Sequence, residues 1–509
     1  METRSAKRKK LFLIAESEAA ENSIDRITDL PDAVLHHILS LLSIKSIAQT
    51  SLLSRRWRSL WSSFPDLDFS TINPNPLSSK NLAKTSHSSS ATGMDFIAQV
   101  LALHDKHSDI RILRFRAHLS FSRLNGLIRR AIRLNVQQLD VEFATDDYFN
   151  IPRSVLASES LRVFKLKSHC PGFHLPPSSV MRDGFRSLHT LSLSLVVLYN
   201  QPSLVDLFSD SSFPNLKKLN LDACFGLKHL SVGCRALEDF SLENCFELQG
   251  LNISGPKMER VRVSYCFDAY SEKSWVKINA PRLRILRWEY NSITDNCALE
   301  NLSLLREVSI GFIILHEDIN FEKIQSVSNL LSGLSHAHCL KFESKCFEIL
   351  SINNYFAVYL QPFHNLKSLE LHTSFNKNNV LGIACLFRSS PTLHTLILKI
   401  NNDYNMERRE WNRDLWDMSS SEEEQFWESQ TQTLKSFLEN LKVVEVHGFL
   451  ECENEVSLAK FLLKHGKALQ EMTLCTGNSG ARDSLRRQKI RSQMMGFSWA
   501  SSNAKISFR

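Results

Sequence analysis

Apolar side chains recur along most of this chain in triplets with the spacing L-x-x-L-x-L. Three of these triplets follow one another at a constant interval: Leu216, Leu219 and Leu221; Leu237, Phe240 and Leu242; and Met258, Val261 and Val263. Two more fall between them: Leu227, Leu230 and Val232; and Leu248, Leu251 and Ile253. Apolar triplets therefore recur every ten or eleven residues here. This pattern predicts coils with a short strand on both faces, like a flattened solenoid.

The same triplet continues beyond this stretch at somewhat longer intervals. It begins at Ile110, Val136, Leu161, Leu188, Leu283, Leu305, Leu366, Leu393, Leu441 and Leu469. The intervals between close neighbours, roughly 22 to 28 residues, are typical of leucine-rich repeats. One coil cannot bury its apolar edge, whereas stacked coils bury a continuous core and align their strands in a parallel sheet. The residues between the leucines, such as Lys218, Asn220, Asp239 and Ser241, then point outward, either as a ligand surface or merely into solvent.

The N-terminal region has a helical pattern instead. Pro31 suits a first helical turn, with Asp29 and Asp32 at its positive end. Apolar residues follow at helical spacing and form a stripe wider than one neighbour requires: Val34, Leu35, Ile38, Leu39, Leu41 and Leu42. A second helix is expected over Ile44 to Leu52, and a third begins after Ser54, carries Trp57 and Trp61, and ends at Pro65.

Three such short helices bury too little apolar surface to be very stable alone. They therefore either complete their core against a partner protein or form a helical cap on a larger domain.

The C-terminal region predicts a different unit. Residues 436 to 474 give a strand, a loop, a helix with Val456, Leu458, Ala459, Phe461, Leu462 and Leu463, and a second strand. A strand, crossover helix and parallel strand form one right-handed unit that can cover the end of a solenoid. Val444, Val446, Phe461, Leu462, Met472 and Leu474 are its predicted inner face.

Three segments keep the repeat pattern poorly. Residues 73 to 92 are rich in serine and predict a linker, and residues 402 to 432 are polar and predict an exposed loop. From Gly311 to Phe363 the pattern is irregular, with a helix expected over Ile324 to Leu334. This part is either an insertion that shapes a ligand pocket or a degenerate repeat.

Charge is concentrated at the two ends. The net charge is +7, of which residues 1–10 carry +4 and residues 481–509 carry +6, so the remainder sums to 7 − 4 − 6 = −3. This argues against a broad nucleic-acid-binding face. Lys7, Arg8, Lys9 and Lys10 resemble a nuclear-import signal, with a solubilising tail as the alternative. Leu11 to Ala15 is too short for a signal peptide and no apolar run approaches a membrane span, so we expect the nucleus or cytoplasm and no membrane partner.

The residues that support catalysis or metal binding are sparse. The chain has 11 cysteines but no C-x-x-C pair, and three of them recur as Cys224-Phe225, Cys245-Phe246 and Cys266-Phe267 within the repeat. Reduced structural thiols are therefore expected. His336, His338 and Cys339 lack a second ligand pair at zinc spacing. No phosphate-binding loop or nucleophile-elbow motif occurs. We expect no catalytic residues, no metal and no cofactor.

The N-terminal region carries these short strings: Leu30-Pro31-Asp32, Ile38-Leu39, Thr50-Ser51, Leu53-Ser54, Arg56-Trp57, Leu60-Trp61 and Leu67-Asp68-Phe69. On these strings rests a resemblance to a plant F-box. It departs at Ser43, where many F-boxes carry proline, which predicts a looser turn there. The adaptor-facing residues implied by the resemblance are Leu30, Pro31, Val34, Ile38, Leu39, Ile47, Leu53, Trp57 and Trp61.

The order of the parts is similar to that of plant F-box/FBD/LRR-repeat proteins, whose FBD the C-terminal unit resembles. The fold expected is α/β: a three-helix F-box, a leucine-rich-repeat solenoid and a β-α-β cap. The limits expected are a basic tail at 1–22, the F-box at 23–70, a linker at 71–95, the solenoid at 96–435, the cap at 436–480 and a basic tail at 481–509.

The resemblance implies a non-catalytic substrate receptor of an SCF-type (cullin-RING) ubiquitin ligase. The F-box would bind a Skp-family adaptor, and through it a cullin and a RING protein, while the repeats bind a target protein. The target-binding residues are unknown from the sequence. The competing interpretation is a leucine-rich-repeat scaffold without a role in ubiquitin transfer. A secreted or receptor-type repeat protein is disfavoured because no signal peptide or membrane span is expected.

Overall fold

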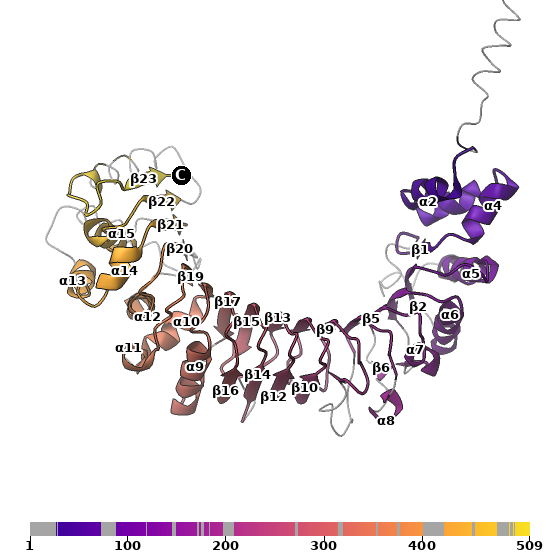
Figure 1. Cartoon of the computed structure of the whole chain (residues 1–509), viewed down its shortest axis with the longest axis horizontal. Coiled ribbons are helices and arrows are strands. Elements are labelled where there is room, and N and C mark those ends of the chain that lie inside the picture. The colour runs from indigo at the N-terminus through magenta and orange to yellow at the C-terminus, as the bar shows by residue number, and fades with distance from the viewer. Residues whose placement is uncertain are drawn as a thin grey trace, which may run out of the picture. The chain divides into compact units, whose positions relative to one another are not determined.

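A computed structural model describes the chain at residues 27, 29–72, 88–118, 120–144, 149–169, 173–174, 178–182, 184–196, 208–269, 273–313, 319–352, 355–373, 377–400, 422–449, 453–475, 488, 492 and 494–509 (Figure 1). The chain divides into two compact units, Met1–Thr145 and Asp146–Arg509. The nuclear-import candidate at residues 7–10 lies outside the described residues.

The first unit combines the three predicted helices with parallel strands. Its elements are α2 (Asp32–Ser40), α3 (Ile44–Thr50), α4 (Arg55–Ser62), β1 (Asp66–Asp68), α5 (Ser88–Leu103), β2 (Ile112–His118), α6 (Phe121–Arg133) and β3 (Gln138–Ala144). Strand β1 pairs with β2, and β2 pairs with β3, both in parallel. Leu67, Leu113 and Leu139 share one register position and are fully buried.

Two serines cap the helices of this unit. The Oγ of Ser54 accepts a hydrogen bond from the backbone N–H of Trp57 at 3.3 Å, as the sequence predicts. The Oγ of Ser43 accepts one from the N–H of Ser46 at 3.2 Å. Serine thus supplies an N-cap bond that proline could not, and the looser turn expected at Ser43 stays a prediction.

The F-box helices are joined closely to the first repeat coils. The backbone N–H of Arg111 donates to the carbonyl of Pro65 at 2.9 Å, and that of Asp105 donates to Ser62 at 2.9 Å. The pairing of β1 with β2 therefore joins residues on either side of residue 70, where the F-box was expected to end. Helix α5 begins at Ser88, inside the segment expected to be a linker. The expected limits remain predictions, but the F-box and the first two coils form one compact unit.

The second unit is built from two parallel sheets on opposite sides of the coils (Figure 1). One sheet contains, in order, β5 (Val163–Ser168), β7 (Thr190–Ser194), β9 (Lys218–Asp222), β11 (Asp239–Glu243), β13 (Arg260–Ser264), β15 (Ile285–Ser292), β17 (Glu307–Ile313), β18 (Cys339–Phe342), β19 (Ser368–Thr373), β20 (Thr395–Ile400), β21 (Val443–His447), β22 (Glu471–Cys475) and β23 (Lys505–Phe508). The other contains β8 (Phe208–Ser209), β10 (His229–Gly233), β12 (Gly250–Ser254), β14 (Trp275–Asn279) and β16 (Asn296–Glu300). The prediction of a flattened solenoid is confirmed.

Several short elements complete this unit near its start. They are the paired strands β4 (Phe149–Asn150) and β6 (Phe173–His174), and the helices α7 (Arg153–Leu156) and α8 (Ser178–Met181).

The register of these sheets matches the period of the sequence. Phe240 of β11 pairs with Leu219 of β9 and Val261 of β13, which occupy the same triplet position one repeat earlier and one repeat later. The residues that begin the outlying triplets, from Ile110 to Leu469, are each at most 1% exposed. Within each unit the repeated apolar positions therefore form the buried core of the stacked coils.

The recurring cysteines form a buried column along the same coils. The N–H of Cys224 donates to the Sγ of Cys245 at 3.4 Å, and the Sγ of Cys266 donates to the carbonyl of Ser264 at 3.1 Å. In the next coil the Oδ1 of buried Asn291 takes this role and accepts from the N–H of Cys266 at 2.9 Å. Burial raises the pKa of the Cys266 thiol, so this thiol stays protonated.

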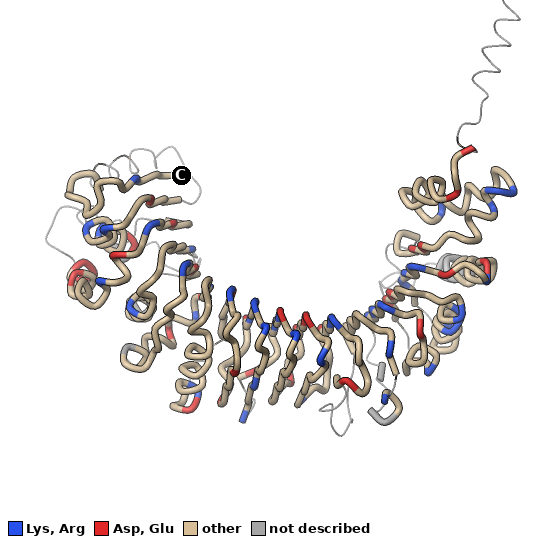
Figure 2. The backbone as a smooth tube through the Cα atoms, in the orientation of Figure 1, with Lys and Arg blue, Asp and Glu red and all other residues tan. Residues whose placement is uncertain are grey.

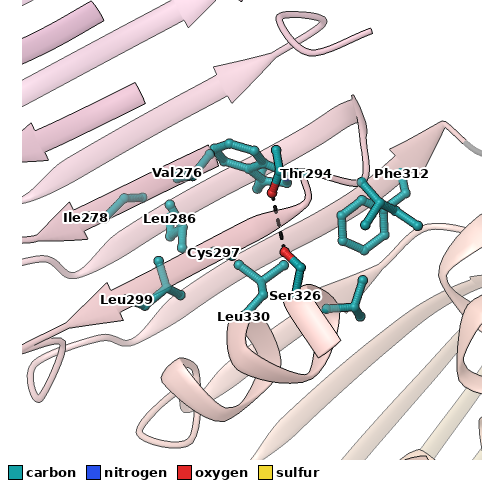
Figure 3. Close-up of a pocket in the computed structure, with 12 residues that line it drawn as sticks. Val276, Ile278, Leu286, Thr294, Cys297, Leu299, Phe312, Ser326 and Leu330 are labelled. Carbon is teal, nitrogen blue, oxygen red and sulfur yellow. Dashed lines mark hydrogen bonds between the residues drawn. The ribbon is translucent and has the colours of Figure 1, made fainter. Parts of the chain in front are cut away.

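Helices replace the second sheet after β16. They are α9 (Phe321–Gly333), α10 (Lys345–Leu350), α11 (Tyr355–Tyr359) and α12 (Lys377–Arg388). Helix α9 confirms the helix predicted from Ile324 and packs against β16, where the hydroxyls of Thr294 and Ser326 lie 3.5 Å apart (Figure 3). The cavity between them has a volume of about 10 Å³ and mainly apolar walls, which is room for about one water molecule. Strand β18 also keeps the register of the long sheet between β17 and β19, so the described part of residues 311–363 favours the degenerate-repeat interpretation.

Part of the expected loop at 402–432 is helical. Residues 401–421 lie outside the described part, but Glu422–Ser429 form helix α13 and Lys435–Asn440 form α14. The loop prediction was wrong at α13 because Trp427 is fully buried, with its ring 5.7 Å from that of Phe461. The Nζ of Lys460 also pairs with Glu424 at 2.7 Å.

The C-terminal strand, helix and strand are present as β21, α15 (Glu453–His465) and β22. Strands β21 and β22 are parallel, with Val443 opposite Glu471, and the six inner-face residues are each at most 5% exposed. The sheet does not end at β22, because β23 pairs with it through Glu471 and Lys505. The segment expected to be a basic tail therefore contributes the last strand of this sheet.

Candidate interaction surfaces

Large apolar side chains remain exposed on the F-box helices. Helix α2 buries Leu35 and Leu39, but its stripe extends around the helix to Val34 and Ile38, which are 42% and 37% exposed. Leu52, in the turn after α3, is 82% exposed. The exposed apolar F-box surface consists of Ile27, Val34, Ile38, Leu41, Leu42, Leu52 and Leu53. All seven lie between residues 27 and 53, and exposed apolar side chains gathered in this way are typical of protein interaction sites.

The structure divides the predicted adaptor-facing residues into three groups. Pro31, Val34, Ile38 and Leu53 are exposed; Leu30 and Trp61 are partly buried; and Leu39, Ile47 and Trp57 are buried. Only the first two groups can contact a partner without rearrangement. The buried group packs beneath the surface and holds its helices in place. The set remains a prediction.

Sequence analysis left four exposed residues out of that set: Ile27, Leu41, Leu42 and Leu52. The apolar stripe already included Leu41 and Leu42, so the signal was present in the spacing. Leu52 was hidden because it was assigned to a second helix, and α3 ends before it at Thr50.

An ion pair fixes the start of α2 against α4. The guanidinium of Arg56 donates to the carboxylate of Asp32 and to the carbonyl of Leu30, both at 2.5 Å. These bonds hold the predicted Leu30-Pro31-Asp32 string beside the third helix.

The outer face of the long sheet in the second unit has the opposite character. Lys218, Asn220, Asp239 and Ser241 are not buried, whereas the leucines between them are, as the triplet pattern predicts. Both signs of charge occur along the coils (Figure 2). Neighbouring strands pair these charges: Arg260 with Asp239 at 3.1 Å, Arg262 with Glu243 at 3.5 Å, and Lys399 with Glu370 at 2.6 Å.

The densest of these charges surround His372 on β19. Its Nδ1 lies 3.4 Å from Glu343 on the segment after β18, and its Nε2 lies 2.6 Å from Glu370. The hydrogen bond to Glu343 raises the pKa of His372, and the same bond lowers the pKa of Glu343. Lys341 pairs with Glu343 at 3.0 Å. This network is polar, paired and only partly exposed.

The described residues contain no arrangement that suggests metal binding or a membrane span. No three His, Cys, Asp or Glu side chains gather in them as metal ligands would. None of the described helices is both long enough and apolar enough to cross a bilayer.

Comparisons with known proteins agree with this architecture. Residues 27–68 match the F-box domain family, and residues 103–269 and 227–499 match the family described as At1g61320/AtMIF1, LRR domain. The F-box/FBD/LRR-repeat protein At4g03220 of Arabidopsis thaliana is 51% identical over 516 residues, which cover 100% of both chains.

More distant relatives from the same plant cover less of the chain. The F-box/FBD/LRR-repeat protein At3g26920 is 28% identical over 88% of this chain and 89% of its own. The F-box/LRR-repeat protein At5g38396 is 24% identical over 74% of this chain and 78% of its own.

Proposed function

The chain belongs to the F-box/FBD/LRR-repeat family of plant proteins, and on this basis we propose that it is the non-catalytic substrate receptor of an SCF-type cullin-RING ubiquitin ligase. The observation that carries the proposal is the exposed apolar F-box surface. Seven large apolar side chains remain uncovered there, although the helices beneath them are packed and capped. Covering them would gain about 25 cal/mol for each Å² of apolar area removed from water.

The occupant we assign to this surface is a Skp-family adaptor. Val34 and Ile38 lie one turn apart on α2, and Leu52 and Leu53 follow α3, so both helices present anchors. The adaptor would connect the chain to a cullin and a RING protein. These partners work in the nucleus and cytoplasm, where we place this chain.

The coils of the second unit would hold the target protein. Their core is buried, so side chains on the outer face can change without loss of the fold. Catalysis in this assembly needs only that lysines of the target are held near the ubiquitin-charged enzyme. No residue of this chain would take part in bond making or breaking.

Co-purification with a Skp-family adaptor tests the proposal. The double variant Val34→Ala and Ile38→Ala should lose roughly 2 to 5 kcal/mol of adaptor binding, because buried interface anchors typically contribute about 1 to 3 kcal/mol or more each. The matched control is Leu304→Ala, which removes an apolar side chain that is 51% exposed in the second unit. Circular dichroism checks that both variants remain folded.

A wild-type complex should also bind added cullin and RING proteins on size-exclusion chromatography. Adaptor binding that is undiminished in the double variant would contradict the assigned surface. A wild-type chain that binds no adaptor would favour the scaffold without a role in ubiquitin transfer.

A further inference from the structure

Two tyrosines stack on each other at one edge of the long sheet in the second unit. Tyr265 follows strand β13 and Tyr290 lies in β15, with ring centroids 4.7 Å apart and planes 9° apart. Both residues are 39% exposed. Each ring therefore covers one face of the other, and both side chains remain accessible to a ligand.

The backbone at these positions does not favour tyrosine. Corresponding residues of successive coils have positive φ: Leu195, Ala223, Asn244, Tyr265 and Tyr290, with values from 48° to 57°. The coil path requires this conformation, which asparagine tolerates and a bulky side chain adopts rarely. The tyrosines therefore do not improve the turn, and their contribution has to come from the rings.

A bulge and a glycine open space beside Tyr290. Trp288 pairs with Ile310 and Asn291 with Phe312, so Glu289 and Tyr290 together lie opposite Gly311. A Cβ at Gly311 would lie 2.9 Å from the Cγ of Glu343. Glycine thus leaves room for the Glu343 stem next to Tyr290, and the charge of Glu343 raises the pKa of the Tyr290 hydroxyl. The electrostatic potential at this hydroxyl is therefore negative.

Two polar groups at this place have no partner among the described residues. The carboxylate of Glu289 forms no ion pair there, whereas that of Glu343 is occupied by Lys341. The Oγ of Ser309, on the next strand, is buried and has no hydrogen-bond partner among the described residues. The residue as a whole is only 7% exposed. The Glu289 carboxylate therefore remains available near Tyr290, whereas the enclosed Ser309 hydroxyl cannot reach a ligand.

We propose that Tyr265, Tyr290 and Glu289 form the receptor for a cationic side chain, arginine before lysine, of the bound target protein. A guanidinium stacks on aromatic faces and forms two hydrogen bonds with one carboxylate. This inference rests on the proposed target-binding role of the coils. An acidic ligand is the alternative, because Arg287 and Lys341 flank Ser309 in register. Lys341 pairs with Glu343 at 3.0 Å and its charge also acts on Glu289, but of these two carboxylates only that of Glu289 forms no ion pair among the described residues, which favours a cation.

The test measures binding of the full-length chain to immobilised random peptides whose central residue is fixed as Arg, Lys, Gln or Glu. The Arg library should bind best, with a roughly two- to thirtyfold preference over the Gln library. Glu289→Gln should remove this preference. Arg287→Gln is the matched control from the same strand and should preserve it, because it removes a repelling charge.

A second variant, Tyr265→Gly with Tyr290→Gly, separates recognition from folding. Glycine accepts positive φ freely, so the melting temperature should not fall while the preference for arginine is lost. Rings with a structural role would instead lower the melting temperature, and Glu289→Gln would then decide the question alone. No preference among the libraries, or a preference for Glu that Arg287→Gln removes, would overturn the proposal.

Adaptor binding should be unchanged in all these variants. If the proposed ligase role is wrong, the wild-type chain will not bind the adaptor. If only this inference is wrong, adaptor binding will remain and the peptide libraries will show no preference for arginine.

Discussion

The F-box helices and the coils of the second unit expose side chains of opposite character. The F-box leaves seven large apolar side chains uncovered between residues 27 and 53. The outer face of the long sheet instead carries ion pairs such as Lys399 with Glu370 and Arg260 with Asp239. An apolar surface gains free energy from any close-fitting cover, whereas a charged face selects partners by the arrangement of its charges.

This difference suits one fixed partner and one changeable partner. Apolar anchors on α2 and after α3 bind best to a single complementary surface. Outer-face residues stand over a core that the coils bury themselves, so their substitution changes stability little, usually within about 0.5 kcal/mol. Under the proposed function, target recognition on the coils could therefore change while the adaptor-binding helices stay the same.

The largest expected effect tests whether the coils bury their own core. Leu242 of β11 is fully buried, and Leu242→Ala should lower the free energy of unfolding by about 3 to 5 kcal/mol. Leu52→Ala is the matched change on the F-box and should stay within about 0.5 kcal/mol, because Leu52 is 82% exposed. Urea unfolding measures both. Equal losses in the two variants would remove the contrast between the regions.

The next effect concerns the end of the long sheet. A chain that stops after Cys475 lacks β23 and the fully buried Met494, and it leaves the edge of β22 open. We expect a loss of roughly 2 to 4 kcal/mol and self-association through the open edge. Thermal unfolding and size-exclusion chromatography measure these changes. A soluble monomer with an unchanged melting temperature would show that β22 can end the sheet.

The sequence predicted most of the coils because their apolar period records burial directly. Leu219, Phe240 and Val261 stand one repeat period apart in the chain and are adjacent in the sheet. The triplet of the β18 coil was not recognised in the sequence because its first position is Ala337. This residue is fully buried, but alanine is too small to mark an apolar triplet clearly. Trp427 escaped because it follows an acidic run that suggests a loop.

The surfaces were less predictable than the core. Helical spacing identified the apolar stripe of α2, but it could not show that Leu39 and Trp57 turn inward while Leu52 turns outward. The Tyr265–Tyr290 pair depends on strand register and on a bulge, and its two residues belong to neighbouring coils. Such contacts are set by the stacking of whole coils, and no local pattern reports them.

A smaller effect is expected from the helix cap of the F-box. Ser54→Ala removes the bond to the N–H of Trp57 and should cost about 1 kcal/mol, within the usual range of about 0.5 to 2 kcal/mol. Ser59→Ala, an exposed change inside α4, should cost nothing because alanine favours helices. Hydrogen exchange should rise in α4 for the first variant and stay unchanged in the coils of the second unit. Faster exchange in those coils as well would show that the two regions are not energetically separate.

The smallest expected effect is the pH dependence of the His372 network. Its carboxylate partners raise the pKa of His372 above its ordinary value of 6.5. The folded state therefore binds this proton more tightly than the unfolded state does. The resulting stabilisation is fully present below about pH 6.5 and is lost as pH rises through the raised pKa.

Glu343 and Glu370 act in the opposite direction. Their pKa values lie below the ordinary 4.5, so their contribution is present above about pH 4.5 and is lost as pH falls through the lowered values. Between these limits all three groups stabilise the coils. The side chains are partly exposed, so water and salt weaken the effect.

Comparison of the wild-type chain with His372→Gln isolates the histidine. The wild-type advantage in urea midpoint should be larger at pH 6.0 than at pH 8.5, because only the protonated imidazole gains from both carboxylates. Added salt should reduce the advantage at pH 6.0 and leave pH 8.5 nearly unchanged. An advantage of equal size at both pH values would mean that His372 acts through packing. The contribution of this part of the charged face to stability would then come from packing, and the contrast with the apolar F-box surface would be smaller than the ion pairs suggest.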